Sequence, residues 1–259
     1  MVMSVHDRLV KSRHAAIIKL LSEHGKMRIN DLADRFGVSP LTIRRDLNCL
    51  IEEGVARRTH GWAEIIDPFG GPIHSNAIMA KRVIARKAAH LVNDGDTVFI
   101  NTSSTALSVI EHIAAQNVTI VTNNGKVLQL NLPPTLSVIL AGGEIRLPKW
   151  SMAGEFTMAG IKQVSAAKAI MGCSGISAAR GLTTLVSHET SINSLMLERS
   201  EKHIIVADST KIGIDSSFCY GRPDQIDVLI TDTDADEDEL ARLRQAGTRR
   251  IIQADPHIS

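Results

Sequence analysis

Hydrophobic positions three or four residues apart run through the segment SPLTIRRDLNCLI at residues 39–51. This spacing places them on one face of an α-helix, which we expect to pack into a core. Ser39 can cap the first-turn amides, and Pro40 suits the first helical position, where a missing N–H costs nothing. The pattern therefore predicts a helix that begins at Pro40. Its inward-facing residues are Ile43, Leu47, Leu50 and Ile51.

The opposite face of this helix carries side chains that suit DNA. At about 100° per residue, the outward positions are Leu41, Arg45, Asn48 and Glu52, with Thr42 and Arg44 on the flanks. Arginine can pair with guanine, asparagine with adenine and threonine with either, through base edges in a major groove. A solvated amphipathic helix explains this segment equally well when it is taken alone, so the neighbouring segments decide.

Two shorter helical patterns precede this segment. Residues 12–24 carry one apolar face and are followed by a glycine, which predicts a first helix. Residues 27–29 are a short extended piece, and Asn30 is a candidate N-cap. A second short helix is expected at residues 31–36, ended by Gly37. Two short helices, a glycine-containing turn and a third helix with a polar outer face predict a helix-turn-helix.

The residues that follow predict a wing beside the third helix. In VARRTHGWAEII, residues 55–66, the positions Val55, Ala63 and Ile65 are apolar on either side of a candidate turn at His60–Gly61. This alternation is typical of two antiparallel strands. Basic side chains on such a wing would contact phosphates, which positions a reading helix without specifying sequence. These candidates are Arg57, Arg58 and His60.

The composition changes after the wing. Residues 67–76, DPFGGPIHSN, contain two prolines and two glycines and no periodic pattern, which predicts a linker. Helix-like runs, at 77–92 and about 104–115, then alternate with short β-branched apolar runs, which predicts an α/β fold with a mostly parallel sheet covered on both faces. The expected strands are 97–101, 118–122, 137–141, 167–172, 203–208, 228–231 and 250–253. The expected domains are 1–66, a winged helix-turn-helix, and 77–259, the larger α/β domain.

Overall composition fits two ordinary domains, with 259 residues and 44% hydrophobic content. The net charge of +1 divides into +3 for residues 1–66 and −2 for the remainder, so the positive excess lies with the predicted DNA-binding part. Cys49, Cys173 and Cys219 are far apart in the sequence, which fits a reducing cytoplasm better than a disulfide framework or a zinc site. No apolar run approaches the roughly 18 residues of a membrane span, and we expect a cytoplasmic protein.

Polar residues gather where the predicted strands end, which is where α/β sheets bind ligands. In INTSSTALSVIEHI, residues 100–113, a strand leads through four hydroxyl side chains into a helix, and free amides with hydroxyls can hold a phosphate. A plain helix cap with spare hydroxyls is the alternative. The ligand candidates at all the strand ends are Thr102, Ser103, Ser104, Thr105, Thr122, Asn123, Asn124, Gly142, Gly143, Ser174 and Gly175.

Two lysines are candidate cations for such a ligand. Lys211 lies in DSTKIG after a predicted strand, and Lys81 lies near the start of the first helix of the larger domain. A solvated surface lysine is the alternative for each. His188 and Glu189 follow a possible cap at Ser187, and no pair of histidines has metal-ligand spacing. We therefore expect neither a metal nor a cofactor.

The run INDLADRFGVSPLTIRRDLNCLIEEGVARRTHG at residues 29–61 closely resembles the winged helix-turn-helix signature of the DeoR/GlpR family of bacterial transcriptional repressors. The resemblance continues through the α/β domain. It implies that Thr42, Arg44 and Arg45 enter operator DNA, with Ser39 as the helix cap. It also implies a phosphosugar-binding domain similar to ribose-phosphate isomerases, with the phosphate loop at 102–105 and Lys211 in a segment like the family's Asp-Ser-Ser-Lys.

Three residues depart from the family pattern. Trp62 stands where a second glycine is usual, Ser103 where a glycine is typical, and Asn101 where an acid is common. The first departure concerns the turn of the wing, and the other two concern the ligand site. The resemblance to the family therefore implies a phosphate group on the ligand more strongly than it implies which ligand carries it.

Two functions fit this sequence. The first is a repressor that leaves its operator when a phosphorylated sugar binds, acting as a homo-oligomer, either dimer or tetramer. The second is a phosphosugar isomerase or deaminase with an accessory N-terminal domain, which needs a positioned acid–base pair. Asp208, Glu144 and Glu189 are the available carboxylates, and the sequence does not bring any two of them together. A sensor only has to bind its ligand differently in two states, so we expect the repressor.

Overall fold

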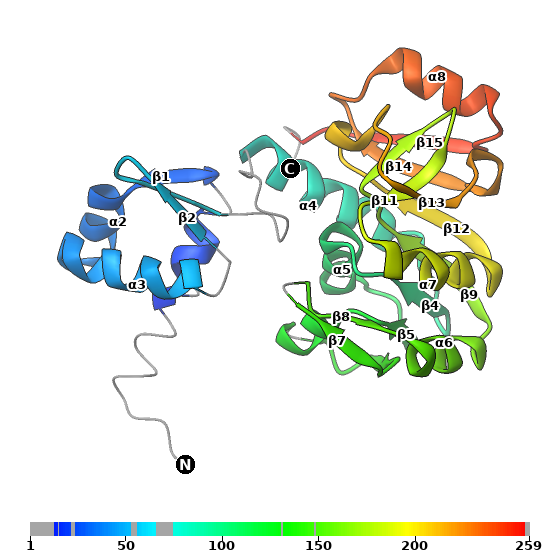
Figure 1. The fold of residues 1–259 in the computed structure, drawn as a ribbon, viewed down its shortest axis with the longest axis horizontal. Helices are drawn as coiled ribbons and strands as arrows, with labels where there is room; N and C mark the ends of the chain where they lie inside the picture. Colours follow the sequence, from blue (N-terminus) through cyan, green and yellow to red (C-terminus); the bar gives the residue numbers. More distant parts are fainter. Residues whose placement is uncertain are drawn as a thin grey trace. The chain divides into compact units, whose positions relative to one another are not determined.

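The computed structural model describes residues 13–14, 16–21, 24–52, 56–65, 75–130, 132–147 and 149–256. The chain divides into two compact units, Met1–Met79 and Ala80–Ser259 (Figure 1). Val55 and most of the expected linker lie outside the described residues. Helix α4 begins at Ser75, two residues before the sequence pattern places it. No helix in these described ranges is both long and apolar enough to cross a membrane.

The first unit contains the predicted helix-turn-helix. Residues 16–21 are helical, and they are followed by β1 (Lys26–Arg28), α2 (Ile29–Phe36), α3 (Pro40–Glu52), β2 (Ala56–Thr59) and β3 (Trp62–Ile65). Gly37 ends α2 in the left-handed conformation at φ 61°, which glycine adopts without steric cost. The Ser39 hydroxyl accepts the Thr42 amide at 3.1 Å, as the cap prediction requires. Side chains from the first helix, α2, α3 and the sheet share one core.

Two predictions in this unit are wrong in detail. Asn30 does not cap α2, because the helix begins at Ile29, two residues before the expected start at residue 31, and places Asn30 in its first turn. Ile51 does not face the core; its side chain is 36% exposed, since it lies at the edge of the apolar stripe. The predicted two-stranded wing is present as the antiparallel β2–β3 hairpin, and β1 adds a third strand to it in the order β1-β3-β2.

The wing keeps a tight turn despite Trp62. His60 and Gly61 both have positive φ, 47° and 85°, as a two-residue type I′ hairpin requires. Trp62 begins β3 opposite Thr59 and Arg28. The cations of Lys26 and Arg28 lie 5.3 and 5.0 Å from its ring centroid, within cation–π range. Trp62 therefore packs on β1, on the far side of β3 from β2.

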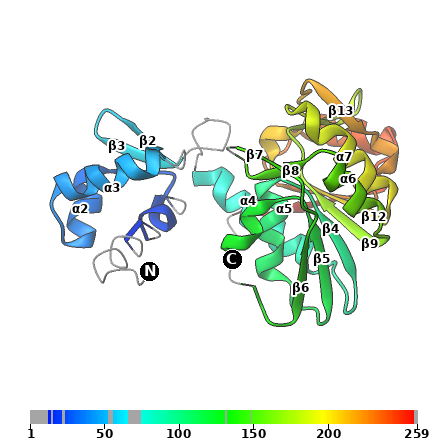
Figure 2. The ribbon, with the colours of Figure 1, turned by 60° about the horizontal axis from the view of Figure 1, so that its bottom comes forward.

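The second unit is built on a seven-stranded parallel sheet in the order β15-β14-β12-β9-β4-β5-β6 (Figures 1 and 2). The strands are β4 (Thr97–Ile100), β5 (Val118–Thr122), β6 (Leu136–Leu140), β9 (Ala166–Met171), β12 (Ser200–Val206), β14 (Val228–Asp232) and β15 (Arg250–Ala254). All seven correspond to strands expected from the sequence. The inner strands bury apolar β-branched side chains on both faces, which is why they read as continuous hydrophobic runs, whereas the edge strand β6 leaves Ile139 49% exposed.

Helices cover both faces of this sheet. Helices α4 (Ser75–Ala89) and α5 (Ser104–Val109) contribute to one core cluster through residues such as Ile84 and Val109. Helices α6 (Glu155–Lys162), α7 (Ser187–Glu198) and α8 (Glu237–Gln245) contribute to the other. The helix expected at 104–115 is shorter, because a 3₁₀ turn at Ile110–His112 replaces its second half.

Five further strands were not expected from the sequence. β10 (Gly175–Ser177), β11 (Gly181–Thr184) and β13 (Phe218–Gly221) form an antiparallel sheet, and β7 (Glu144–Arg146) pairs with β8 (Ser151–Ala153) as a hairpin. Each has only three or four residues, which is too short to show a period in the sequence. Three more 3₁₀ turns lie at Gly125–Gln129, Ser209–Lys211 and Pro223–Gln225.

Candidate DNA-reading surface and ligand site

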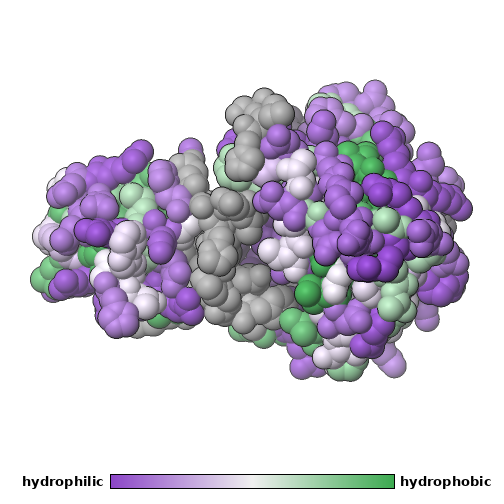
Figure 3. All heavy atoms as spheres, turned by 90° about the horizontal axis from the view of Figure 1, so that it is seen from above, coloured by the Kyte–Doolittle hydropathy of each residue, from purple (hydrophilic) through white to green (hydrophobic). Residues whose placement is uncertain are grey.

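Helix α3 presents its predicted polar face to solvent. Arg44, Arg45 and Asn48 are exposed, Thr42 is half-buried, and the Leu41 side chain is 56% exposed. The face of the N-terminal unit visible in Figure 3 is mainly hydrophilic. A helix that buries one stripe and leaves arginine, asparagine and threonine outside matches what base-edge contacts need.

The wing lies beside this helix. The Arg58 guanidinium donates to the Asn48 carboxamide oxygen at 3.5 Å, a long hydrogen bond that links β2 to α3. His60 is exposed in the turn of the wing. Arg57 is paired within the wing, since its Nε lies 2.9 Å from Glu64 Oε1. Arg58 and His60 therefore remain direct candidates for phosphate contacts. Arg57 could contact a phosphate only if its ion pair with Glu64 opened or if its guanidinium contacted both groups at once.

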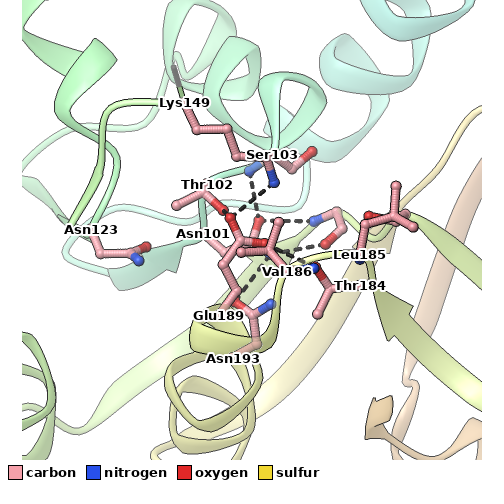
Figure 4. Close-up of polar contacts among 12 residues, drawn as sticks. Asn101, Thr102, Ser103, Asn123, Lys149, Thr184, Leu185, Val186, Glu189 and Asn193 are labelled. Atoms are coloured by element: carbon pink, nitrogen blue, oxygen red, sulfur yellow. Dashed lines mark hydrogen bonds and ion pairs between the residues drawn. The ribbon is translucent and has the colours of Figure 1, made fainter. Parts of the chain in front are cut away.

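Polar side chains at the ends of β4 and β9 form a buried network in the second unit (Figure 4). The Asn101 side chain is 2% exposed; it donates to the Gly172 carbonyl at 2.9 Å and accepts the Gly172 amide at 3.0 Å. The Tyr220 hydroxyl donates to the same carbonyl at 3.0 Å. Burial raises the pKa of Tyr220 well above its usual value, so this hydroxyl keeps its proton. Asn101 thus joins two strand ends rather than presenting a free acid.

Glu189 on α7 is the centre of this network. Its carboxylate, on a residue only 3% exposed, accepts hydrogen bonds from Thr102 Oγ1 at 2.7 Å and Thr184 Oγ1 at 2.9 Å. The Lys149 ammonium lies 2.9 Å from the carboxylate oxygen that Thr102 contacts. The hydroxyl of Thr102 is therefore already engaged inside the protein. The sequence prediction did not include Lys149 or Thr184, and it did not place Glu189 in the ligand site.

Ser103, Ser104 and Thr105 form the loop that leads into α5. Ser103 caps this helix by accepting the Ala106 amide at 3.3 Å, so its hydroxyl is also engaged. The first helical hydrogen bond runs from Leu107 to Ser103, which leaves the amides of Ser104 and Thr105 without a helical partner. Ser104 is exposed and Thr105 is buried. With only six helical residues, α5 offers local amides rather than a large dipole.

The end of β5 carries buried polar atoms without partners. Asn123 is 1% exposed; its amide nitrogen donates to the Met152 carbonyl at 3.0 Å, while its Oδ1 has no hydrogen-bond partner among the described residues. Ser151 Oγ, at the start of β8, is equally buried and unpaired within that part of the chain. Thr122 and Asn124 are engaged, since they accept the amides of Asn124 and Lys126 respectively.

The other predicted strand-end residues have mainly structural contacts. The Gly142 carbonyl accepts the Thr157 hydroxyl at 2.6 Å, and a Cβ on Gly143 would lie 2.1 Å from that hydroxyl. Ser174 Oγ accepts the Leu185 amide at 3.2 Å. Gly175 is buried in β10, where a Cβ would lie 2.3 Å from a backbone oxygen. These residues shape the strand ends without presenting a free polar side chain there.

The two predicted cations lie on different elements. Lys211 ends the 3₁₀ turn after Asp208 and is half-buried near Cys173, whose thiol it influences electrostatically. Burial, with a smaller contribution from the nearby Asp208, raises the pKa of Cys173 to about 12, while Lys211 opposes the shift. Lys81 is half-buried in the second turn of α4.

A separate pocket of about 370 Å³ lies between α4 and the end of β15. It is lined by Val83, Arg86, Lys87, His90, Gln253, Ala254 and Asp255. Its basic side chains make it a second place where an anion could bind, and none of them was a candidate from the sequence. Across the described ranges, no three His, Cys, Asp or Glu side chains are grouped to hold a metal ion.

Both parts of the chain match known families. The family model for the DeoR-like helix-turn-helix domain matches residues 13–69. The family model for the DeoR C terminal sensor domain matches residues 76–233. The chain is 34% identical over 226 residues to the glycerol-3-phosphate regulon repressor of Escherichia coli (strain K12), covering 85% of this chain and 90% of the relative. It is 31% identical over 241 residues to a lactose phosphotransferase system repressor of Staphylococcus epidermidis, covering 89% and 93%.

Similarity to solved structures is weaker. A ribose 5 phosphate isomerase A from Neisseria gonorrhoeae superposes with a TM-score of 0.37 at 20% identity, covering 51% of this chain and 52% of that chain.

A winged helix-turn-helix unit joined to an α/β unit with polar strand ends is the architecture of a DNA-binding regulator with its own sensor domain. The chain belongs to the DeoR family of transcriptional regulators. Its relatives are named as repressors and not as enzymes, so the expectation of a regulator rather than an isomerase or deaminase is confirmed.

Proposed function

We propose that this regulator represses genes for the use of a sugar or polyol and leaves its operator when a phosphorylated sugar or polyol binds its sensor domain. The observation that carries the proposal is the buried network around Glu189, which brings a carboxylate, the Lys149 ammonium and the loop 102–105 together at the strand ends. The named targets of two relatives, a glycerol-3-phosphate regulon and a lactose phosphotransferase system, support a ligand of this class.

The DNA-binding part of the proposal rests on α3 and the wing. Exposed side chains on α3 read base edges, and basic side chains on the wing contact phosphates. One helix of this kind reads only a few base pairs, so two related copies on successive turns of the duplex supply the selectivity. The protein therefore acts as a homo-oligomer on DNA in the bacterial cytoplasm. The DNA-contacting residues are Ser39, Leu41, Thr42, Arg44, Arg45, Asn48, Arg58 and His60, with Arg57 if it leaves Glu64.

The ligand part of the proposal concerns the strand ends of the second unit. The free amides of Ser104 and Thr105 hold the phosphate, and the unpaired Asn123 Oδ1 and Ser151 Oγ meet the remainder of the ligand. Lys211 and Lys81 supply further positive charge at the rim. The other strand-end candidates form the walls, namely Thr102, Ser103, Thr122, Asn124, Gly142, Gly143, Ser174 and Gly175.

The test combines ligand binding with DNA release. The full chain is used to select its own duplex from a random-sequence library, and affinity for that duplex is then measured by fluorescence anisotropy. Glycerol 3-phosphate, ribose 5-phosphate and glucose 6-phosphate are added in turn, each beside its unphosphorylated counterpart. We expect one or more phosphate esters to weaken duplex binding by about 5–150-fold at saturation, the range of ordinary coupling free energies. Equal duplex affinity with and without every phosphate ester would contradict the proposal.

A further inference from the structure

Lys149 lies in the turn between β7 and β8, but most of its side chain is removed from solvent. Only 13% of the side chain is exposed, although Leu147 and Trp150 in the same turn are 71% and 41% exposed. A lysine in a surface turn normally keeps its ammonium in water. This one instead extends to the strand ends, where its Nζ lies 2.9 Å from Glu189 Oε1. The hairpin therefore delivers a cation to the network.

The position of the ammonium is fixed by the oxygen that it contacts. Thr102 Oγ1 donates to the same Glu189 oxygen at 2.7 Å, so the ammonium lies beside Thr102 and the loop that follows it. Figure 4 shows the Lys149 side chain ending next to Thr102 and Ser103. An ammonium has three N–H donors, so it can direct them to more than one oxygen atom around it.

Stability alone does not explain this ion pair. Taking two charges out of water costs several kcal/mol per ion, and a buried pair often contributes no more than apolar side chains of similar volume. Glu189 also has other donors, because Thr102 and Thr184 contact its two oxygens. A lysine brought to this carboxylate from a surface turn is better explained by a ligand that needs both charges.

A second observation lies on the same hairpin. Ser151 follows Lys149 by two residues, and its buried Oγ has no partner among the described residues. The Oδ1 of Asn123 is also buried and unpaired among the described residues. The backbone carbonyl of Asn123 accepts the Met152 amide at 2.7 Å. The hairpin thus carries Lys149 in its turn, and its strand β8 holds one of these two unpaired polar atoms and pairs with the residue that holds the other. Figure 4 shows the amide end of Asn123 pointing toward the network.

We infer that Lys149 and Glu189 are the specificity-determining pair of the sensor site and select a ligand that carries both a phosphate ester and a hydroxyl. This rests on the proposed function. The Lys149 ammonium binds the phosphate, and the Glu189 carboxylate accepts a hydrogen bond from the hydroxyl. Because Glu189 neutralises the charge of Lys149, an anion that has no hydroxyl, such as sulfate, binds weakly.

The experiment is calorimetric titration of full-length variants with glycerol 3-phosphate, ribose 5-phosphate, glucose 6-phosphate and sulfate. Lys149→Met should weaken every phosphate ester that binds the wild type by about tenfold or more, the effect of losing one charge-assisted hydrogen bond. Glu189→Gln should change the affinities for the two kinds of anion differently. The affinity for sulfate should rise, and the ratio of ester affinity to sulfate affinity should fall. The control Lys162→Met removes an exposed lysine on α6 and should change neither affinity.

Each result decides a different question. If no ester of the panel binds the wild type, the proposed function fails and the inference fails with it. If an ester binds the wild type and Lys149→Met equally, only the inference fails. Loss of binding in Arg86→Ala with unchanged binding in Lys149→Met would place the ligand between α4 and β15, which also overturns it. Weaker sulfate binding in a folded Glu189→Gln would contradict the charge argument; if that variant does not fold, Lys149→Met decides.

Discussion

Arg13 holds Asp46 of α3 through two parallel hydrogen bonds, from Nε to Oδ2 at 2.6 Å and from Nη2 to Oδ1 at 2.9 Å. His14 Nε2 lies 3.2 Å from the same carboxylate, on a residue that is only 5% exposed. Charge-assisted bidentate pairs of this kind fix orientation as well as adding stability. The first helix therefore anchors the inner side of the helix whose outer side is available to DNA.

Asp46→Ala should lower the free energy of unfolding of the first unit by about 3 kcal/mol, since it leaves the Arg13 guanidinium half-buried without its carboxylate. Urea unfolding monitored through Trp62 measures this directly in a Trp150→Phe background, where Trp62 is the remaining tryptophan. Asp34→Ala, which removes an exposed carboxylate on α2, is the matched control. Equal midpoints for the two variants would show that the pair does not stabilise this unit.

The two arginines of the DNA surface should behave differently. Arg45→Ala should cost about 1–3 kcal/mol on the selected duplex and little on unrelated duplexes, because a base contact carries specificity. Arg58→Ala should weaken all duplexes alike and reduce the salt dependence by about one phosphate contact. Gel-shift titrations at several salt concentrations separate the two effects. Arg250→Ala removes one charge from an exposed position in β15 and serves as the control; unaltered affinity in Arg45→Ala would exclude base reading by this residue.

Local periodicity predicted the parts of this fold that depend on local sequence. Helix α3 shows its apolar spacing, cap and proline within thirteen residues, and each central strand buries both faces and reads as an apolar run. The turn at His60–Gly61 was also predictable, because its backbone conformation favours glycine at the second position. Ile51 was misplaced because the apolar stripe is narrower than the spacing rule assumes.

The centre of the proposed ligand site was not predictable in this way. The hydrogen bond between Thr102 and Glu189 joins residues 87 positions apart, and that between Lys149 and Glu189 joins residues 40 apart. Lys149 lies in a turn between two strands of three residues each, which carry no periodic signal. Strand-end reasoning identified Thr102 but not its acceptor, because the acceptor lies on a helix rather than at a strand end.

The three cysteines should differ in reactivity. Cys49 and Cys219 are exposed, whereas burial raises the pKa of Cys173 to about 12. At pH 8 only about one in 10,000 Cys173 thiols would be ionised, and the thiolate is the reactive form. A thiol-reactive disulfide reagent should modify Cys49 and Cys219 of the native chain rapidly and the half-buried Cys173 much more slowly, and all three should react rapidly after unfolding. Stability is unaffected by this group below pH 8, since its thiol is protonated in both states. Three equally fast phases would contradict the placement of Cys173.

Ser104 tests whether the loop before α5 holds the phosphate. Ser104→Glu places a carboxylate beside the free amides of the first turn, where it can satisfy them and let the chain fold, while it repels a dianionic ligand. Because Ser104 is in the second unit, duplex affinity without ligand should stay at the wild-type value. The release caused by phosphate esters should disappear, so the variant behaves in a cell as a repressor that cannot be induced. Lys211→Ala should reduce the response less, since it removes attraction without adding repulsion.

The measurement is duplex affinity with and without saturating glycerol 3-phosphate, ribose 5-phosphate or glucose 6-phosphate, for the wild type and both variants. A ligand shifts an equilibrium only by its difference in affinity for the two states, so a variant that binds no ester must show equal affinities in both conditions. Ser108 is not a suitable position for the control substitution, because the Ser108 hydroxyl donates to the Thr105 carbonyl inside the same helix. Ser137→Glu, on the exposed side of β6, adds the same charge elsewhere and should respond like the wild type. If Ser104→Glu responds at the wild-type ester concentration, residues 102–105 only cap α5, and the phosphate binds beside another cation.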